Sequence, residues 1–484
     1  MRLRSIVVLM AAAVLAGCGA PSQGTGADAA AIPDGSGDGS IGAPLDLVYS
    51  MNPATYPVDS SIAPNVPSST GGAVASYAIA PALPAGLMLD ATTGIISGTP
   101  TAIASASTYT VTASNASGAA TATLSIAVVG ASAPSSVAAG LYHTCAIVGG
   151  EVACWGDDGN GELGNGATAL VSPPVLVSGL AHVDAIAAGN DFTCALAGGG
   201  VTCWGRNDRG QLGNDSTSES HVPVAVVGLA SGVTAISIGA DGNHACALVG
   251  GGVKCWGAND LGQLGNNSTT DSSVPVAVTG LSSGVSAIAL GAFHSCAIVS
   301  GSAQCWGDNL SGQLGNNSLA SSSTPVAVSG LTSGVTALSG GVAFTCALVA
   351  GGVKCWGDNT EGVLGDHSQV ASLVPVDVTG LGSGVSAIAV GGYHTCAVVG
   401  SAVQCWGNNS DGDLGDGMTG ETFSTVPVVV PGVTSTALAE GSAHGCAVVA
   451  AGVTCWGWNV NGQVGDGTTD NRYAPVAVVG LSAL

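Results

Sequence analysis

Fourteen of the fifteen cysteines in this chain form seven pairs with identical spacing, and this pattern limits the fold more than any other feature. The two members of each pair are nine positions apart, and the first members recur at intervals of 49, 52, 50, 50, 50 and 50 residues. A fixed period of this size indicates an array of similar units, and paired cysteines indicate an oxidising compartment. The pairs are Cys145 with Cys154, Cys194 with Cys203, Cys246 with Cys255, Cys296 with Cys305, Cys346 with Cys355, Cys396 with Cys405, and Cys446 with Cys455.

The composition favours an all-β protein that does not bind nucleic acid. Glycine occupies 77 of the 484 positions, charged residues make up 8%, and the apolar segments are short and rich in valine. The formal charge is -23, and outside Arg2 and Arg4 only five basic residues face thirty acidic ones. Neutralising nucleic-acid phosphates requires clustered lysine and arginine, which this chain lacks.

The N-terminal residues are typical of the leader of an exported lipoprotein. Residues 1–17 carry two arginines and an apolar run, Ile6 to Ala16, that is too short to span a bilayer. The segment from Leu15 to Cys18 resembles a bacterial lipobox, which implies that Cys18 becomes the lipidated first residue. The alternative is an ordinary secretory leader with a free Cys18. Gly19, in place of the aspartate that retains some lipoproteins at the inner membrane, favours the outer membrane or cell surface, in periplasmic or external orientation.

Two domains follow a Gly/Ala/Ser/Asp-rich tether at residues 18–45. Residues 46–129 alternate short strand patterns with Pro and Gly turns. The segments Pro81 to Leu87 and Thr92 to Pro100 resemble bacterial immunoglobulin-like domains, which implies a β-sandwich used as a spacer or adhesion module. A calcium site there would have to use Asp46, Asp59 and Asp90, so we favour a spacer.

Residues 130–484 contain seven copies of a unit with four strand signals, which is the count of a propeller blade. One copy contains His294-Ser295-Cys296-Ala297-Ile298, then Cys305-Trp306-Gly307, then Gly312-Gln313-Leu314-Gly315, then Pro325-Val326-Ala327-Val328. These motifs resemble the regulator of chromosome condensation repeat family, which implies a seven-bladed β-propeller. The last copy ends where another first strand would begin, and Ser136 to Gly140 supplies such a strand at the opposite end, so the resemblance implies that both chain ends could share one blade.

The cysteine spacing predicts one disulfide per blade. Gly149 and Gly150 lie midway between Cys145 and Cys154, and such pairs suit two-residue hairpin turns that need positive φ. Counting outward from this turn places the two cysteines opposite each other at a non-hydrogen-bonded pair, with Cα atoms about 4.5 Å apart. Ala450-Ala451 suits such a turn least. Isolated pairs at this spacing do not fit a zinc site.

Two repeated residue types could be mistaken for functional sites. Histidine stands two positions before the first cysteine in five units and phenylalanine in the other two, so we expect a packed strand position rather than a metal site. A tryptophan follows the second cysteine in every unit, which favours core packing. The residues are His143, His244, His294, His394 and His444, Phe192 and Phe344, and Trp155, Trp204, Trp256, Trp306, Trp356, Trp406 and Trp456.

We expect no catalytic residue, cofactor or metal. The chain contains no nucleophile elbow and no phosphate-binding loop. The turn from Asn409 to Asp413 is the most calcium-like, but it lacks the terminal glutamate of a complete loop, and Asx residues also form tight turns without an ion. Calcium binding by these turns stays open.

Functional residues are expected where the repeat is broken. The position two residues after each tryptophan varies, and Phe423, Trp458, Arg472 and Tyr473 fall in expected loops of the last two units. Aromatic residues and arginine are common interface anchors, so these four residues form a hypothetical partner-binding patch. Scattered loop residues without a partner are the alternative.

Two functions remain for a protein that we expect to be a monomer. The first is a non-catalytic surface lipoprotein whose propeller binds a protein or glycan. The second is a propeller-type inhibitor of a periplasmic or secreted enzyme. The resemblance also implies guanine nucleotide exchange on a small GTPase, which the exported, disulfide-bonded character of the chain disfavours.

Overall fold

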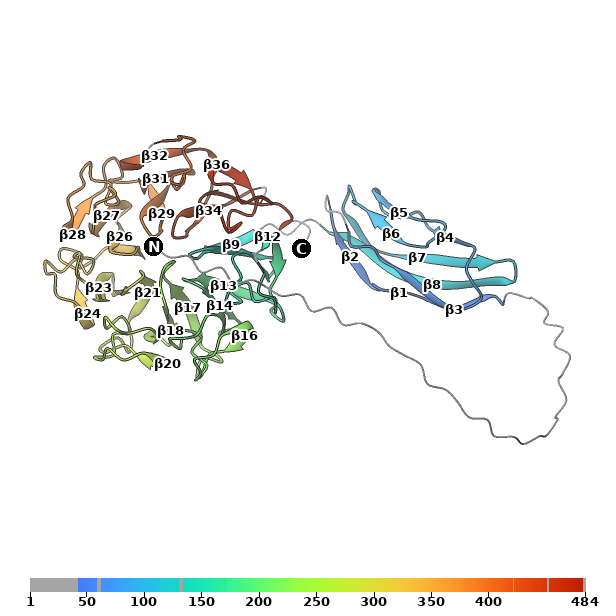
Figure 1. Ribbon diagram of the computed structural model, residues 1–484, viewed down its shortest axis with the longest axis horizontal. Coiled ribbons are helices and arrows are strands. Elements are labelled where there is room, and N and C mark those ends of the chain that lie inside the picture. The colour runs from blue at the N-terminus through green and yellow to red at the C-terminus, as the bar shows by residue number, and fades with distance from the viewer. Residues whose placement is uncertain are drawn as a thin grey trace, which may run out of the picture.

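The computed structural model describes residues 42–58, 62–129, 134–169, 171–420, 422–450 and 452–481. Every regular element in these ranges is a strand, and they form a small sandwich followed by a ring of seven sheets (Figure 1). Among these residues no helix has the length and apolar character needed to cross a bilayer. Cys18, with the rest of the leader and most of the tether, lies outside the described residues, as does Asp59.

The N-terminal domain is a β-sandwich. One layer is a four-stranded sheet in the order β2-β8-β7-β4, and the other contains the pairs β1-β3 and β5-β6. Tyr109, Val111 and Leu124 from the first layer pack against Leu47 and Ile96 from the second, and all five are buried. The strands are β1 (Pro44–Tyr49), β2 (Ala54–Pro57), β3 (Pro67–Gly71), β4 (Ser76–Ala80), β5 (Leu87–Leu89), β6 (Ile96–Gly98), β7 (Ala104–Asn115) and β8 (Gly118–Val129).

Two of the three carboxylates that a calcium site in the sandwich would need, Asp46 and Asp90, accept hydrogen bonds from nearby residues. Asp46 Oδ2 accepts a hydrogen bond from Thr70 Oγ1 at 2.8 Å. Asp90 Oδ1 accepts the backbone N–H groups of Thr92 and Thr93, both at 2.8 Å, and these bonds lower the pKa of the Asp90 carboxyl. Both carboxylates therefore already have donors within their own strand pair or turn.

Each of the seven blades is a four-stranded antiparallel sheet made of strands that are consecutive in the chain. The first strands surround the central channel: β9 (Pro134–Ala139), β13 (Val183–Ala188), β17 (Val233–Ile238), β21 (Val285–Leu290), β25 (Val335–Gly340), β29 (Val385–Val390) and β33 (Ala437–Glu440). The second strands are β10 (His143–Val148), β14 (Phe192–Ala197), β18 (His244–Val249), β22 (His294–Val299), β26 (Phe344–Val349), β30 (His394–Val399) and β34 (His444–Val449).

The third and fourth strands of each blade lie progressively further from the channel (Figure 1). The third strands are β11 (Glu151–Gly156), β15 (Gly200–Gly205), β19 (Gly252–Gly257), β23 (Ser302–Gly307), β27 (Gly352–Gly357), β31 (Ala402–Asn408) and β35 (Gly452–Gly457). The outer strands are β12 (Val171–Leu176), β16 (Ser220–Ala225), β20 (Ser272–Ala277), β24 (Ser322–Ala327), β28 (Ser372–Asp377), β32 (Phe423–Thr434) and β36 (Arg472–Ala477). The repeated proline of the Pro-Val motif lies in these outer strands, where it blunts an exposed sheet edge.

The prediction that the two chain ends share one blade is wrong. Strand β9 pairs with β10 in the first blade, and β33 to β36 form the last blade without a strand from the N-terminal side. The ring instead closes through side-chain packing, in which Val137 and Trp155 of the first blade contact Val453 and Leu481 of the last. Each sequence repeat supplies all four strands of one sheet, so neither end of the propeller contributes a strand to the blade at the other end.

The structure contains the seven predicted disulfides, one in each blade. Each joins the second strand of its blade to the third, and the two Cα atoms are 4.0 or 4.1 Å apart, somewhat closer than the expected 4.5 Å. The bonded residues are Cys145 and Cys154, Cys194 and Cys203, Cys246 and Cys255, Cys296 and Cys305, Cys346 and Cys355, Cys396 and Cys405, and Cys446 and Cys455.

The hairpin turns set the register of these disulfides. Cys145 lies directly opposite Cys154 in the β10-β11 ladder, as the count from the turn predicts. Gly149 and Gly150 form the turn with φ of 62° and 87°, as a type I′ hairpin requires. In the last hairpin Gly452, which begins β35, has a φ of 140°, an angle open to glycine, and the hairpin of the fifth blade has Ala350 at a φ of 51°.

Removing one disulfide should lower stability without changing the fold. We expect the double substitution Cys296→Ala/Cys305→Ala to reduce the free energy of unfolding by about 2 to 3 kcal/mol, because the bridge closes a short loop in the unfolded chain. Urea unfolding followed by tryptophan fluorescence, without reductant, measures this. A loss below about 0.5 kcal/mol would show that the hairpin alone holds the register.

Candidate functional site

The ring of histidines joins neighbouring blades. In four of the seven seams, histidine Nε2 lies 2.8 Å from a threonine or serine hydroxyl of the next blade. That hydroxyl donates to a backbone carbonyl of the histidine's own blade, so its oxygen accepts the proton and each histidine carries Nε2–H in its neutral form. The pairs are His143–Thr193, His244–Ser295, His294–Thr345 and His444–Thr144, the last of which closes the ring.

The repeated tryptophans complete the same seams. Each indole Nε1–H donates to a backbone carbonyl of the preceding blade at 2.8 or 2.9 Å, and all seven indoles are fully buried. In four seams this carbonyl also accepts the hydroxyl described above, so one oxygen binds two groups of the next blade. Where Phe192 replaces histidine, the facing residue is Ala245, so neither side of that seam needs a polar partner.

The seam between the sixth and seventh blades departs from this pattern. Gly445 stands at the hydroxyl position, and a Cβ there would lie 2.3 Å from Glu440 Oε2. Glu440 fills the space and binds His394 Nε2 at 2.9 Å, with both side chains buried. Burial and the nearby Asp413 raise the pKa of Glu440, and burial lowers that of His394 to about 4, so we assign a neutral pair.

This seam contains the one cluster with metal-type ligands in the described part of the chain: His394, Cys396 and Glu440. Cys396 is bonded to Cys405 and supplies no thiolate, and His394 Nε2 already binds Glu440. The donor set therefore does not suit a metal.

In the calcium-like turn of the sixth blade, one oxygen bonds within the turn, one bonds to the seventh blade, and Asp413 Oδ1 is buried without a hydrogen-bond partner. Asn409 Oδ1 accepts the Leu414 N–H at 3.1 Å, and Asp411 Oδ1 accepts Asn471 Nδ2 at 2.9 Å. These contacts fit the interpretation that Asx residues shape the turn without an ion.

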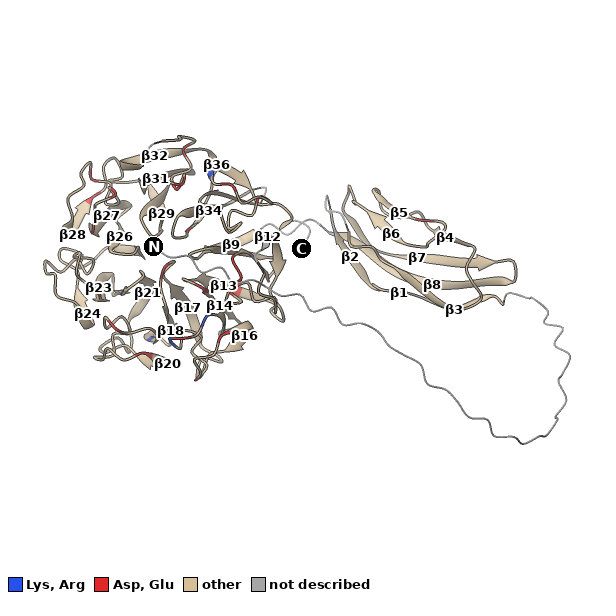
Figure 2. Cartoon of the chain, in the orientation of Figure 1, with Lys and Arg blue, Asp and Glu red and all other residues tan. Residues whose placement is uncertain are grey.

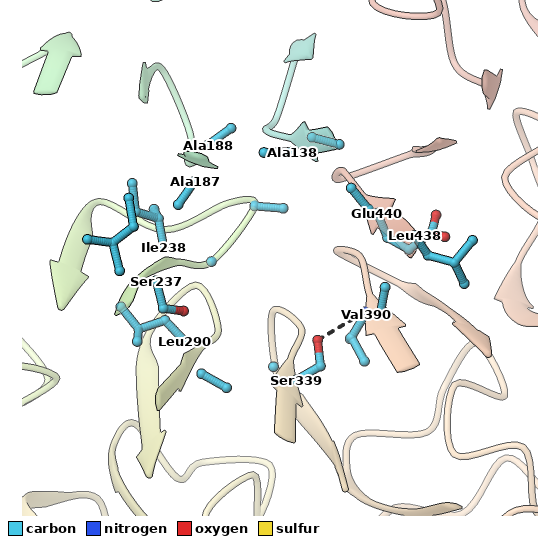
Figure 3. A pocket seen from close by; sticks show the side chains of 18 of the residues that line it. Ala138, Ala187, Ala188, Ser237, Ile238, Leu290, Ser339, Val390, Leu438 and Glu440 are labelled. Carbon is cyan, nitrogen blue, oxygen red and sulfur yellow. Dashed lines mark hydrogen bonds between the residues drawn. The ribbon is translucent and has the colours of Figure 1, made fainter. Parts of the chain in front are cut away.

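The central channel is a cavity of about 280 Å³ lined by the first strand of every blade (Figure 3). Its side chains are mostly small and apolar, such as Ala138, Ala187 and Leu290. Ser339 Oγ accepts the Val390 N–H at 3.1 Å, and Glu440 is committed to the seam. The channel therefore offers little polar chemistry of its own.

The varied residues of the repeat lie together on one face of the propeller, which we call the loop face. Antiparallel strands bring the first-to-second and third-to-fourth connections of each blade to the same side. In every blade, the backbone N–H of the second residue after the repeated tryptophan donates to the carbonyl just before the second strand, at 2.8 or 2.9 Å. The residue pairs so joined are Tyr142/Asp157, Asp191/Arg206, Asn243/Ala258, Phe293/Asp308, Ala343/Asp358, Tyr393/Asn408 and Ala443/Trp458.

Aromatic rings from different blades meet on this face. The rings of Tyr142 and Trp458 lie 5.5 Å apart at an interplanar angle of 72°, an edge-to-face contact between the first and last blades. Phe293 and Tyr393 are 39% and 46% exposed, which is unusual for side chains of this size. Sequence analysis missed Tyr142, Phe293 and Tyr393 as site residues, although their position varies between units just as that of Trp458 does.

The structure places the four residues of the hypothetical patch in one loop and at the starts of two strands. Only Trp458 is in a loop. Phe423 begins β32, and Arg472 and Tyr473 begin β36, so the prediction that these three lie in loops is wrong.

Two of these three strand residues, Arg472 and Tyr473, contact nearby residues of the propeller. The Arg472 guanidinium binds Asp466 and Thr468 of its own blade. Tyr473 packs on Gly412 of the sixth blade, where a Cβ would lie 3.0 Å from its ring.

Asp and Glu outnumber Lys and Arg over the propeller (Figure 2), and the two arginines near the loops of the second blade are paired with carboxylates. Arg206 lies 3.3 Å from Asp191 and 2.8 Å from Asp208, and Arg209 binds Asp260 and Asp271. Burial raises the pKa of the Asp191 carboxyl to about 6 despite Arg206. The mouth of the channel is thus an aromatic and acidic surface.

Comparison with known proteins identifies the fold family. The model of the RCC1-like domain matches residues 119–434, so the chain belongs to that family, and the structure adds a last blade beyond the match. The family described as "Putative Ig domain" matches residues 45–129. No curated protein matches the chain.

Two solved structures share the propeller. Human WBSCR16 is 22% identical with a TM-score of 0.60, covering 68% of this chain and 94% of its own. Prp20p from Saccharomyces cerevisiae is 23% identical with a TM-score of 0.59, covering 72% and 87%. At these identities the likeness shows the fold alone.

Removing one partner of a histidine–hydroxyl pair should lower the free energy of unfolding more than replacing both partners. We expect Thr345→Val to lower the free energy of unfolding by about 1 to 3 kcal/mol, because His294 Nε2–H loses its acceptor while buried. The double variant His294→Phe/Thr345→Ala, matched to the natural Phe192/Ala245 seam, should stay within about 1 kcal/mol of wild type. Urea unfolding measures both, and a double variant as unstable as Thr345→Val would contradict the hydrogen-bond reading.

The same double variant should gain relative stability in acid. Burial lowers the pKa of His294 to about 4, so between about pH 6.5 and 4 the unfolded chain binds a proton that the folded chain refuses. Lowering the pH through this range destabilises wild type at this site, and the variant escapes the effect. We expect the stability difference to shift by about 3 kcal/mol toward the variant between pH 6.5 and 4. A difference that is independent of pH would show that His294 is protonated when folded.

Proposed function

We propose that this chain is an exported, lipid-anchored, non-catalytic protein whose propeller binds a protein partner through its loop face. The aromatic contact between Tyr142 and Trp458 carries the proposal. Both residues stand at varied positions of otherwise repeated units, and both are partly buried rings that pack on each other instead of in a seam, with the Trp458 Nε1–H buried and without a hydrogen-bond partner. Aromatic residues at such positions are typical anchors of protein interfaces.

The leader and the disulfides support the location. The lipobox-like segment ending at Cys18 and the seven cross-strand disulfides both fit an exported chain tethered to the outer membrane or cell surface. Nucleotide exchange on a cytosolic GTPase does not fit this compartment. Prp20p, whose structure was described together with its binding to Gsp1p and histones, illustrates that this fold can serve protein binding.

Inhibition of a periplasmic or secreted enzyme is a second candidate. It requires a concentrated aromatic surface, and the placement of Tyr142, Trp458, Phe293 and Tyr393 on one face favours it. The two functions use the same surface and differ in whether the captured partner loses activity when it binds.

Loss of the aromatic contact should release the partner. We expect cross-linked capture from intact cells to yield a partner with the wild-type chain and at least about tenfold less of it with Tyr142→Ala/Trp458→Ala, the loss expected of interface anchors. The matched control is Val227→Ala, which removes a side chain that is 48% exposed in the connection from β16 to β17, on the face opposite the loop face. Equal capture by all three proteins, each with a wild-type melting profile, would remove the loop face from consideration.

A further inference from the structure

A carboxylate crosses the mouth of the channel on the loop face. The connection between the first and second strands is three residues long in six blades but five residues long in the third, from Gly239 to Asn243. This insertion carries Asp241 to the opposite side of the ring. A Cβ on Gly392 of the sixth blade would lie 2.7 Å from Asp241 Oδ2 and 2.9 Å from Ser442 Oγ of the seventh.

Two tyrosines lie close enough to this carboxylate for its charge to act on their phenols. Tyr142 of the first blade lies in the field of Asp157, Asp191 and Asp241, and Tyr393 of the sixth blade lies in that of Asp241, Asp358 and Glu361. Burial and these carboxylates raise the pKa of both phenols, so the rings stay neutral. The Asp241 charge therefore acts on both phenols.

Neutralising groups are scarce around Asp241. In the described residues Arg206 is the one arginine or lysine among the paired varied positions, and it bridges Asp191 and Asp208. Asn243 Oδ1, an acceptor in the same inserted connection, is buried and has no hydrogen-bond donor there. The Ser442 hydroxyl hydrogen-bonds the Asp241 carboxyl, and the mouth otherwise presents acceptors and π-faces.

We propose that the channel mouth binds a lysine or arginine side chain from a basic segment of the protein partner, with Asp241 as its counter-charge and Tyr142 and Tyr393 beside it. A cation over an aromatic face is attracted by the negative face of the ring, and a nearby carboxylate adds a charge-assisted hydrogen bond. The excess of acid across the loop face attracts a basic partner before contact. This inference rests on the proposed function and specifies the chemistry of the partner.

Synthetic peptides test the chemistry without the partner. We expect hexa-arginine or hexalysine to bind the full chain in calorimetry at about 150 mM salt, where charges beyond direct contact are screened, and hexaglutamate not to bind. Asp241→Asn should weaken binding at least about tenfold, and Tyr142→Leu about threefold or more. The matched control Asp184→Asn removes an exposed charge near the hairpin turns of the opposite face, where Asp184 Oδ2 accepts the Gly198 N–H, and should change binding by less than about twofold.

The outcomes separate the two proposals. Equal weakening by Asp241→Asn and Asp184→Asn, or absence of basic-peptide binding, overturns the cation site. If Asp241→Asn does not fold, Tyr393→Leu takes its place under the same criterion. Partner capture that depends on Tyr142 and Trp458 without basic-peptide binding leaves the protein-binding function standing and removes this inference alone. Peptide binding that depends on Asp241, with partner capture unaffected by the aromatic variants, removes the proposed interface instead.

Discussion

The hydrogen bond from each buried tryptophan to the preceding blade is the interaction on which the rest of the structure depends. A fully buried indole N–H needs an acceptor, and every one of the seven finds it in a main-chain carbonyl of its neighbour. Because the acceptor is backbone, its side chain can change: Glu162, Val363 and Asp413 stand where other blades have glutamine. The bond from Trp155 to Gln463 is the same contact between the first and last blades. The ring therefore closes with the interaction that builds it.

The histidine–hydroxyl contacts and the disulfides stabilise different parts of the propeller. A disulfide fixes the register inside one blade, whereas a histidine fixes the distance between two. The sixth-to-seventh seam shows that the polar contact can be rebuilt from other residues, since Glu440 enters the space left by Gly445. The Phe192/Ala245 seam shows that it can be omitted when both partners are apolar. In each of the five seams that contain the histidine, its buried Nε2 has a polar partner.

Because repeated contacts hold the strands of the propeller in place, the residues of the connecting loops can differ between blades. These varied residues lie on the loop face. Backbone hydrogen bonds place two varied residues side by side in every blade, whatever their side chains. Aromatic and acidic residues have accumulated there, while the channel beneath is lined by small apolar ones. The one lengthened connection, in the third blade, ends over the channel and carries Asp241. The residues proposed to bind a partner are thus concentrated in the loops, where the fold constrains residue type least.

The sequence by itself determined the local structure. The cysteine spacing fixed the hairpin register, because a two-residue turn leaves no freedom in which residues face each other, and the fifty-residue period fixed the blades. Tertiary structure decided what meets across the ring. Tyr142 and Trp458 are far apart in the chain, and Asp241 reaches Ser442 across the channel, so neither contact has a periodic signal in the sequence. The expected strand exchange at closure failed for the same reason: side-chain contacts between the first and last blades, and not the strand pattern, settle how a ring of blades ends.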